Sequence, residues 1–432
     1  MQTRPVPLAA ALIAVAALVG GLACKVAAQE KKPKAAATDG GAAKWPLAEV
    51  PTSGKAGDGL ESFDKAILGI MDRHGIPGGA LALARNGRLI YAKGFGWADL
   101  DNDTPAEPTT LFGLASLSKP ITALATLLLV ERGRLSLEDA AFDHLAHIKP
   151  PQGARVDSRL RKITIRQLLN HTGGWDRTVT GDPVTWSPVI ARSLRLPLPI
   201  TNAQFISFMM AIPLDFDPGT KYQYSNVGYM LLEAVIEQVS GEPYEEFAQR
   251  NVLTPAGIDK AFLGAAKGHR RPGHAKCYLA GTGSEVPLLN LPMAKSALGW
   301  NASVVDMVRL LTALDGSRGK PLLEEKTFAA MVAPPPAPFT KRSNGTYPGL
   351  GWPIVRPSDK GHGYLHDGKW TGMRTFMKCN PAKGVNWVLM FNVAMQPDPD
   401  DRQVTADAAR EAEAVIERAE EFPDLDLFAT YR

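Results

Sequence analysis

The chain has 432 residues, of which 45% are hydrophobic, 21% charged and 7% aromatic. These fractions are typical of a globular protein, and they exclude a disordered chain, a collagen and a coiled coil. Three cysteines cannot hold a chain of this length together, so the sequence is not a disulfide scaffold. The length allows one large domain or two closely packed ones.

The formal net charge of +4 resides entirely before residue 58. Residues 25–57 contain six lysines against three acids, and Arg4 is the one charged residue that precedes them. The rest of the chain is neutral overall, whereas a nucleic-acid-binding protein needs a concentrated basic face. The sequence therefore argues against nucleic acid as a partner.

The first 28 residues have the order of a secretory signal peptide. Arg4 precedes an uncharged, largely apolar run at 8–23, and small residues permit cleavage after Ala28. This run of about 16 residues is shorter than the roughly 20 that a membrane-spanning helix needs. Cys24 offers an alternative, a lipid-anchored cysteine as in bacterial lipoproteins, although Gly21 stands where a lipobox usually has leucine. In either case we expect an exported protein, periplasmic or secreted, that is membrane-bound only if Cys24 is lipidated.

A linker is expected between the signal peptide and the folded part. Residues 29–57 are rich in Lys, Ala, Gly and Pro and have no apolar periodicity. The folded domain is therefore predicted to span residues 58–432. Within it, we expect residues 58–140 and 291–432 to form a lobe that contains a sheet, and residues 141–290 to form a mostly helical lobe.

Apolar periodicity and turn residues predict the elements of this domain. The dipeptide Asn86-Gly87 between two β-like runs favours a type I′ hairpin. The predicted helices are 60–74, 117–132, 227–240, 303–314 and 403–420. The predicted strands are 80–85, 88–93, 349–355, 372–379 and 385–394. Strands at both ends and helices between them indicate an α+β fold, in which helices flank an antiparallel sheet built from N- and C-terminal segments, with an inserted mostly helical lobe.

Ser116 and Lys119 form the first pattern with chemical meaning, at the start of the predicted 117–132 helix. Residues three apart share a helix face, so the two side chains can touch. Backbone N–H groups at a helix start also stabilise negative charge near the hydroxyl. A serine hydroxyl becomes a nucleophile when a base takes its proton, and Lys119 can be that base if burial lowers its pKa. Taken alone, the pattern more often reflects a capping serine and a solvated lysine.

Tyr224 and Asn226 form a second pattern, just before the predicted 227–240 helix. The Tyr224 phenol can share a proton with Ser116 and Lys119. The Asn226 amide can orient both the lysine and a substrate carbonyl. The alternative is a tyrosine on a turn and an asparagine that caps a helix.

A third pattern, His366-Asp367-Gly368, immediately precedes the predicted 372–379 strand. A glycine near an edge strand lets a substrate approach the backbone, and the following N–H, at Lys369, can complete an oxyanion hole. The alternative is an ordinary Asp-Gly hairpin turn.

The three patterns together resemble those of the serine β-lactamase and penicillin-binding-protein superfamily, on the side of the class C β-lactamases and esterases. The class C β-lactamases and the related esterases share the motifs S-x-x-K, Y-x-N and either K-T-G or H-x-G. Residues 163–174 and 218–247 are also similar to family segments, and residues 347–352 resemble a family strand with Pro348 as an extra residue. The resemblance covers roughly residues 60–400 and implies a β-lactamase/transpeptidase-like fold.

The resemblance implies a role for each motif residue. Ser116 would be the nucleophile that forms an acyl-enzyme, Lys119 its base and Tyr224 a proton relay. The backbone N–H groups of Ser116 and Lys369 would hold the oxyanion, and no cofactor or metal would take part. The implied substrate-binding residues are Asn226, His366, Gly368 and Lys369.

His366 stands where a β-lactamase or D,D-peptidase has a fixed cation that holds a substrate carboxylate. An imidazole with the ordinary pKa of about 6.5 is mostly neutral above pH 7, so it lacks the full Coulomb attraction. Lys369 and Arg374 lie close in sequence and could compensate. A second alignment reads residues 369–372 as an interrupted K-T-G. We therefore expect ester or amide hydrolysis ahead of efficient β-lactam turnover.

Other notable residues are interpreted as structural. His171 is expected to be a buried turn histidine, and no spacing of His, Cys or acidic residues indicates a metal site. Cys277 and Cys379 are expected to be two thiols, with pairing after export as the alternative.

Three functions follow as hypotheses. The first is an exported serine hydrolase that cleaves an ester, amide or peptide bond through an acyl-Ser116 intermediate. The second is a penicillin-binding D,D-carboxypeptidase or endopeptidase, or a weak β-lactamase, that acts on peptidoglycan-type substrates with the same residues. The third is a non-catalytic binder that keeps the fold, which the intact motifs disfavour. The expected partner is a small-molecule or peptide substrate, peptidoglycan-derived ones included.

Overall fold

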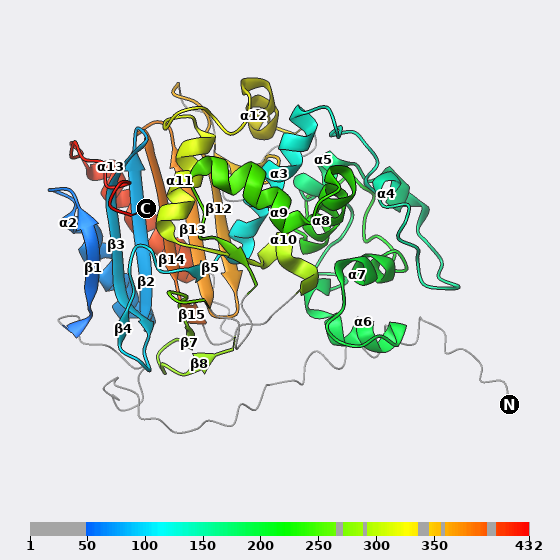
Figure 1. Ribbon diagram of the computed structural model, residues 1–432, viewed down its shortest axis with the longest axis horizontal. Coiled ribbons are helices and arrows are strands. Elements are labelled where there is room, and N and C mark those ends of the chain that lie inside the picture. The colour runs from blue at the N-terminus through cyan, green and yellow to red at the C-terminus, as the bar shows by residue number, and fades with distance from the viewer. Residues whose placement is uncertain are drawn as a thin grey trace. The chain divides into compact units, whose positions relative to one another are not determined.

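An antiparallel sheet forms the centre of the folded domain (Figure 1). The computed structural model describes residues 49–264, 271–287, 292–335, 345–355, 359–394 and 403–431. Over these residues the main sheet has nine strands. In spatial order they are β1 (Thr52–Ala56), β3 (Arg88–Asp99), β2 (Gly78–Arg85), β14 (Val385–Phe391), β13 (Met373–Asn380), β12 (Tyr364–Trp370), β11 (Pro353–Ile354) and β10 (Tyr347–Pro348), with β4 (Thr104–Pro105) paired to β3.

The middle of the sheet joins the two ends of the domain, as predicted. β2 pairs antiparallel with β3 on one side and with β14 on the other, so that Leu81 lies opposite Leu389. Asn86 and Gly87 have φ values of 47° and 76°, which a type I′ turn requires. The predicted hairpin and the predicted α+β fold class are both confirmed.

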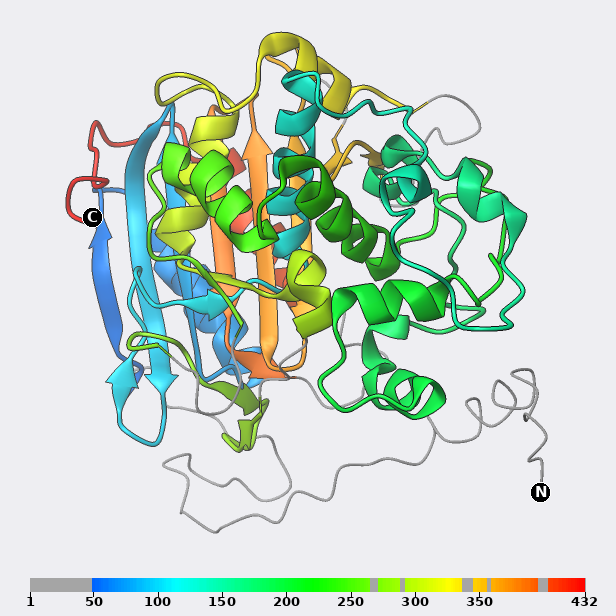
Figure 2. The ribbon, with the colours of Figure 1, turned by 45° about the vertical axis from the view of Figure 1, so that its right-hand side comes forward.

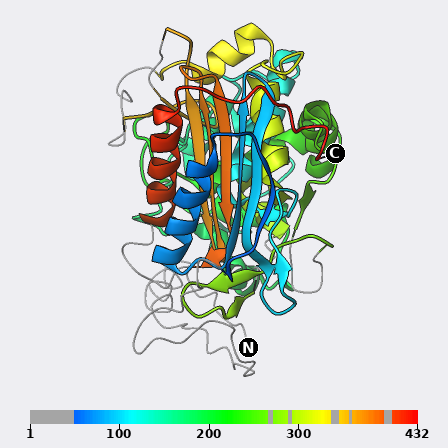
Figure 3. The ribbon, with the colours of Figure 1, turned by 90° about the vertical axis from the view of Figure 1, so that its left-hand side faces the viewer.

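Helices cover both faces of the sheet. Figure 3 shows α2 (Glu61–His74) and α13 (Gln403–Arg418) side by side on one face. Leu81 and Leu83 of β2 belong to the core beneath these two helices. Ala80 and Ala82 point the opposite way, into the larger core that includes α11 (Val304–Leu314). Small side chains on that face let a helix pack close to the strand.

The inserted lobe is mostly helical, and α3 (Ser118–Glu131) lies between it and the sheet (Figures 1 and 2). Every residue of α3 from Ser118 to Leu129 is buried. The helix was predicted with one apolar face, and burial on all sides follows from its central position. The helices of the inserted lobe are α4 (Ala141–His144), α5 (Ile165–Leu169), α6 (Ser187–Leu194), α7 (Asn202–Met209), α8 (Asn226–Ser240) and α9 (Tyr244–Ala248). The helices α10 (Lys295–Leu298) and α12 (Glu325–Val332) follow later in the chain.

Two small sheets connect the predicted helical lobe, residues 141–290, with the rest of the domain. One contains β15 (Val393–Ala394), β7 (Cys277–Leu279) and β8 (Glu285–Val286), and the other contains β5 (Phe112–Gly113), β9 (Trp300–Ala302) and β6 (Phe262–Leu263). From β6 onward the chain therefore pairs with segments that were assigned to the sheet lobe. These strands have two or three residues each, too few to produce a visible period in the sequence.

Three strand predictions also need correction. β1 lies inside the predicted linker 29–57, where its mostly exposed residues leave no apolar pattern. β12 was not among the predicted strands, and a hairpin turn was the alternative interpretation of its Asp-Gly pair. Of the predicted strand 349–355, only β11 is a strand, and residues 349–352 form a tight turn between β10 and β11, closed by a hydrogen bond of 2.8 Å from Gly349 N–H to the Trp352 carbonyl.

The predicted signal peptide, including Cys24, and most of the predicted linker lie outside the described residues. Within the described residues, no helix is both long and apolar enough to cross a bilayer. Cys277 and Cys379 are both buried and are not joined in a disulfide, in agreement with the preferred interpretation.

Candidate active site

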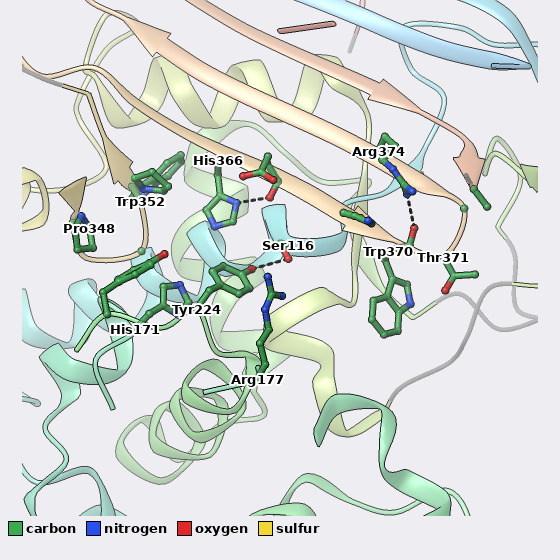
Figure 4. A pocket seen from close by; sticks show the side chains of 18 residues that line it. Ser116, His171, Arg177, Tyr224, Pro348, Trp352, His366, Trp370, Thr371 and Arg374 are labelled. Carbon is green, nitrogen blue, oxygen red and sulfur yellow. Dashed lines mark hydrogen bonds between the residues drawn. The ribbon is translucent and has the colours of Figure 1, made fainter. Parts of the chain in front are cut away.

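A pocket of about 680 Å³ opens between the sheet and the helical lobe (Figure 4). The sheet side contributes β12 and the turn after it, and the helical lobe contributes the loops that precede α6 and α8. Its polar and aromatic lining includes Ser116, His171, Arg177, Tyr222, Tyr224, Trp352, His366, Asp367, Lys369, Trp370 and Arg374.

Ser116 lies at the floor of this pocket, on the short 3₁₀ turn Ala115–Leu117 that leads into α3. Ala115 has a φ of 48°, in the left-handed region that costs a non-glycine residue roughly 1 kcal/mol or more. The turn is held against the sheet, because buried Thr375 on β13 donates from Oγ1 to the Leu114 carbonyl at 3.0 Å. The serine is therefore presented by a strained turn that the sheet supports.

Lys119 follows one turn later and is fully buried. Its Nζ donates to Ser116 Oγ at 3.2 Å and to the Ala297 carbonyl at 2.9 Å. Burial lowers the pKa of Lys119 to about 7; nearby Asp182 opposes this shift and Arg177 adds to it. A large fraction of Lys119 is thus uncharged near neutral pH and able to accept a proton.

Tyr224 contacts the same hydroxyl from the helical lobe, donating from its OH to Ser116 Oγ at 2.8 Å. Burial raises the pKa of Tyr224 above its ordinary value, so the phenol keeps its proton. The His171 ring stacks on Tyr224 with centroids 4.4 Å apart, and its Nδ1 accepts the Ser225 N–H at 3.2 Å. The structure therefore brings together the three side chains that the sequence predicted would meet at position 116.

The sequence matches the Beta-lactamase family over residues 63–412. The chain belongs to the beta-lactamase family. This agrees with the resemblance found from the three motifs.

Among curated relatives, Penicillin-binding protein 4* of Bacillus subtilis is 29% identical over 320 residues, which cover 71% of this chain and 66% of that protein. Protein flp of Staphylococcus aureus is 32% identical over 198 residues, 46% of this chain and 37% of flp. The alignments thus span just under two thirds of the first protein and little more than a third of the second. The octameric penicillin-binding protein homologue of Pyrococcus abyssi has the same fold, with a TM-score of 0.66 at 24% identity over 84% of this chain and 79% of that one.

The third pattern of the sequence, His366-Asp367-Gly368, lies on β12. A Cβ atom built on Gly368 would come 3.2 Å from Ser116 N, so this glycine packs directly against the turn that carries Ser116. Of the alternative segment 369–372, Thr371 and Gly372 lie in the turn between β12 and β13. Lys369 follows Gly368 on the strand and lines the pocket.

Replacing Gly368 by alanine is expected to lower kcat/KM at least about 100-fold, because displacement of a catalytic group by about 1 Å has such an effect. The new Cβ would meet Thr375 Oγ1 at 2.1 Å and the Leu114 carbonyl at 2.7 Å, so β12 must move away from the Ser116 turn. Steady-state kinetics with an activated ester measure the effect. The matched control is Gly69→Ala in α2, where a Cβ has room. Equal activity of both variants would contradict the assignment of β12.

Asn226 does not line the pocket in this structure. Its Nδ2 donates to the Asp182 carboxylate at 2.7 Å, and its buried Oδ1 has no hydrogen-bond partner among the described residues. The structure thus gives Asn226 a contact with Asp182 that the sequence did not indicate. Asp182 lies 44 residues earlier, and no local pattern indicated the pairing.

His366 is 3% exposed and lines the pocket, and its Nδ1 donates to the Asp367 carbonyl at 2.8 Å (Figure 4). The charged residues of the lining are Arg177, Arg374, Lys369 and Asp367, so cations outnumber acids. The predicted candidates Lys369 and Arg374 are therefore both placed at the pocket.

Sequence reasoning missed several contributors to the site. Arg177 lies in the pocket wall with its Cζ 5.2 Å from the centre of the Tyr224 ring, and Figure 4 shows it pointing toward Ser116. His171 is a buried turn histidine, as predicted, and it also lines the pocket. The Ala297 carbonyl carries no sequence signal at all. Among the residues that the structure describes, no cluster of three or more His, Cys, Asp or Glu could hold a metal ion.

Proposed function

We propose that this protein is a serine hydrolase that cleaves an ester, amide or peptide bond through an acyl-Ser116 intermediate. The observation that carries the proposal is the convergence of Lys119 Nζ and Tyr224 OH on Ser116 Oγ, at 3.2 and 2.8 Å, inside a pocket. A buried amine with a pKa near 7 beside a serine hydroxyl is the pairing that makes the hydroxyl a nucleophile at neutral pH.

Acylation begins when neutral Lys119 takes the proton of Ser116 Oγ, which attacks the substrate carbonyl. The backbone N–H groups of Ser116 and Lys369 stabilise the negative oxygen of the tetrahedral intermediate. Tyr224 gives its proton to the leaving group as the scissile bond breaks, and the Lys119 ammonium restores that proton. Water then enters, gives a proton to the same pair and attacks the acyl carbonyl. The bond to Ser116 Oγ breaks as the pair passes that proton to Oγ, which releases the acid and free Ser116.

Stopped-flow kinetics with p-nitrophenyl acetate test the proposal. An acyl-enzyme mechanism with slow deacylation predicts a burst of p-nitrophenol of one equivalent per protein, followed by a slower steady rate. Absence of both burst and turnover, together with inertness to a fluorophosphonate, would favour the non-catalytic binder.

A penicillin-binding D,D-carboxypeptidase or endopeptidase is the second candidate. The observation in its favour is the excess of cations in the pocket lining, where Arg177, Lys369 and Arg374 face a single acid, Asp367. Such a pocket attracts a substrate that carries a carboxylate. Covalent labelling by a fluorescent penicillin, together with release of D-alanine from a D-Ala-D-Ala peptide, would support this candidate. Ester turnover without either would exclude it.

We further propose that the protein is exported, with residues 1–28 as the signal peptide. The supporting features are Arg4, the apolar run at 8–23 and the small residues before Gln29. N-terminal sequencing of the secreted or periplasmic protein should begin at Gln29. A lipidated Cys24 at the N-terminus would identify a lipoprotein instead.

A further inference from the structure

Glu233 on α8 is a buried acid for which the proposed reaction has no use. It is 2% exposed and does not line the pocket. Charged side chains are rarely buried without a partner, and within the described residues no cation forms an ion pair with it. Its contacts are instead with the backbone and hydroxyl of one serine.

That serine is Ser296, on the four-residue helix α10. Glu233 Oε2 accepts the Ser296 N–H at 3.2 Å and lies 2.8 Å from Ser296 Oγ. The same Oγ lies 3.0 Å from the Tyr229 carbonyl on α8. Glu233 and its own helix therefore hold α10 from one side.

The opposite side of α10 is held by α3, the helix that carries Lys119. Thr122 Oγ1 donates to the Ser296 carbonyl at 2.7 Å, and Lys119 Nζ donates to the next carbonyl, that of Ala297, at 2.9 Å. A helix of four residues has too few internal hydrogen bonds to fix its own position. The location of the Ala297 carbonyl, and with it the direction of Lys119 Nζ, thus depends on the contacts made by Ser296.

Counting hydrogen bonds gives the role of Glu233. Ser296 Oγ is the donor in both of its contacts, at 2.8 Å to Glu233 Oε2 and at 3.0 Å to the Tyr229 carbonyl. Glu233 Oε2 therefore accepts both the N–H and the O–H of Ser296.

The electrostatics of the site are consistent with this count. Burial raises the pKa of Glu233 to about 7, and the hydrogen bonds from Ser296 oppose the shift. The charge of Glu237 on α8 adds to the rise in the Glu233 pKa, and that of Lys295 on α10 opposes it. The Glu233 charge in turn raises the pKa of Tyr244 on α9.

We propose that Glu233 is a positioning residue that fixes α10 so that the Ala297 carbonyl directs Lys119 Nζ toward Ser116. The proposal rests on the function proposed above, since it assigns Glu233 a task only if Lys119 is the base. Glu233 itself touches neither substrate nor Ser116.

Two substitutions separate the hydrogen bonding of Glu233 from its charge. Glu233→Gln keeps a donor and an acceptor without any charge, and we expect its kcat to remain within about 3-fold of the wild type. Glu233→Leu keeps the volume but loses both the donor and the acceptor. We expect its kcat to be about 10- to 100-fold lower, because a small displacement of a catalytic group lowers the rate by such a factor. KM should change little in either variant, since Glu233 does not line the pocket.

Glu237→Leu is the matched control. Glu237 lies one turn further along α8 and accepts the Tyr244 N–H at 3.1 Å, so its removal also eliminates a part-buried hydrogen bond but none of the hydrogen bonds to α10. Wild-type kcat in folded Glu233→Leu would overturn the positioning role. A Glu233→Gln variant as impaired as Glu233→Leu would contradict a role that depends on the hydrogen bonds with Ser296. If Glu233→Leu does not fold, Ser296→Ala replaces it, with the same expected loss of kcat at constant KM.

Discussion

Replacing Ser116 by alanine is expected to lower kcat/KM for an activated ester at least about 10⁴-fold and to remove the burst, because loss of a serine nucleophile costs up to about 10⁶-fold in other hydrolases. The fold should be unaffected, since Ser116 contributes one hydroxyl at a partly open pocket floor. Stopped-flow and steady-state rates, with thermal melting as a check on folding, measure the effect.

The matched control is Ser317→Ala, an exposed serine in the loop after α11. This variant should keep the burst and the steady rate of the wild type. A Ser116→Ala variant with the same burst as the control would show that another nucleophile forms the intermediate.

Replacing Lys119 by arginine is expected to lower kcat/KM about 10²- to 10⁴-fold, the usual range for loss of a general base. A guanidinium keeps its proton at every accessible pH, so it cannot accept the proton of Ser116. Lys378→Arg is the control, because Lys378 lies on β13 in an ion pair with Glu413 and does not line the pocket. Unchanged activity of the Lys119 variant would exclude the lysine as base.

The pH profile of the wild type tests the same base without a mutation. Burial lowers the pKa of Lys119 to about 7, and the reactive form is the neutral amine. The value of kcat/KM should therefore be low below pH 6, rise through about 7 and level off above it. A profile that falls over this range would contradict a deprotonated Lys119 as the reactive form.

Much of the fold could be predicted because its signals are local. The helix that becomes α2 and the turn at Asn86-Gly87 depend on periodicity and turn chemistry within a few residues. The same holds for Ser116 and Lys119, whose separation of three residues at a helix start predicts their contact. The meeting of these two with Tyr224 was predicted by resemblance to a family, since 108 residues separate Tyr224 from Ser116.

The parts that could not be predicted depend on tertiary contacts. Strand β12 contains an Asp-Gly pair that favours a turn, and it is a strand because β13 pairs with it along its whole length. The Ala297 carbonyl is a backbone group that any residue could provide, and it matters only because Lys119 reaches it. Asn226 turns to Asp182, whose position depends on the folded loop before α6.

Peptide mapping by mass spectrometry after an acid quench during turnover of p-nitrophenyl acetate tests the central claim most directly. The account predicts a single acetyl group, esterified to Ser116, on the wild-type protein and none on Ser116→Ala. An acetyl group on any other residue of the wild type, or continued turnover with no acylated protein, would contradict it.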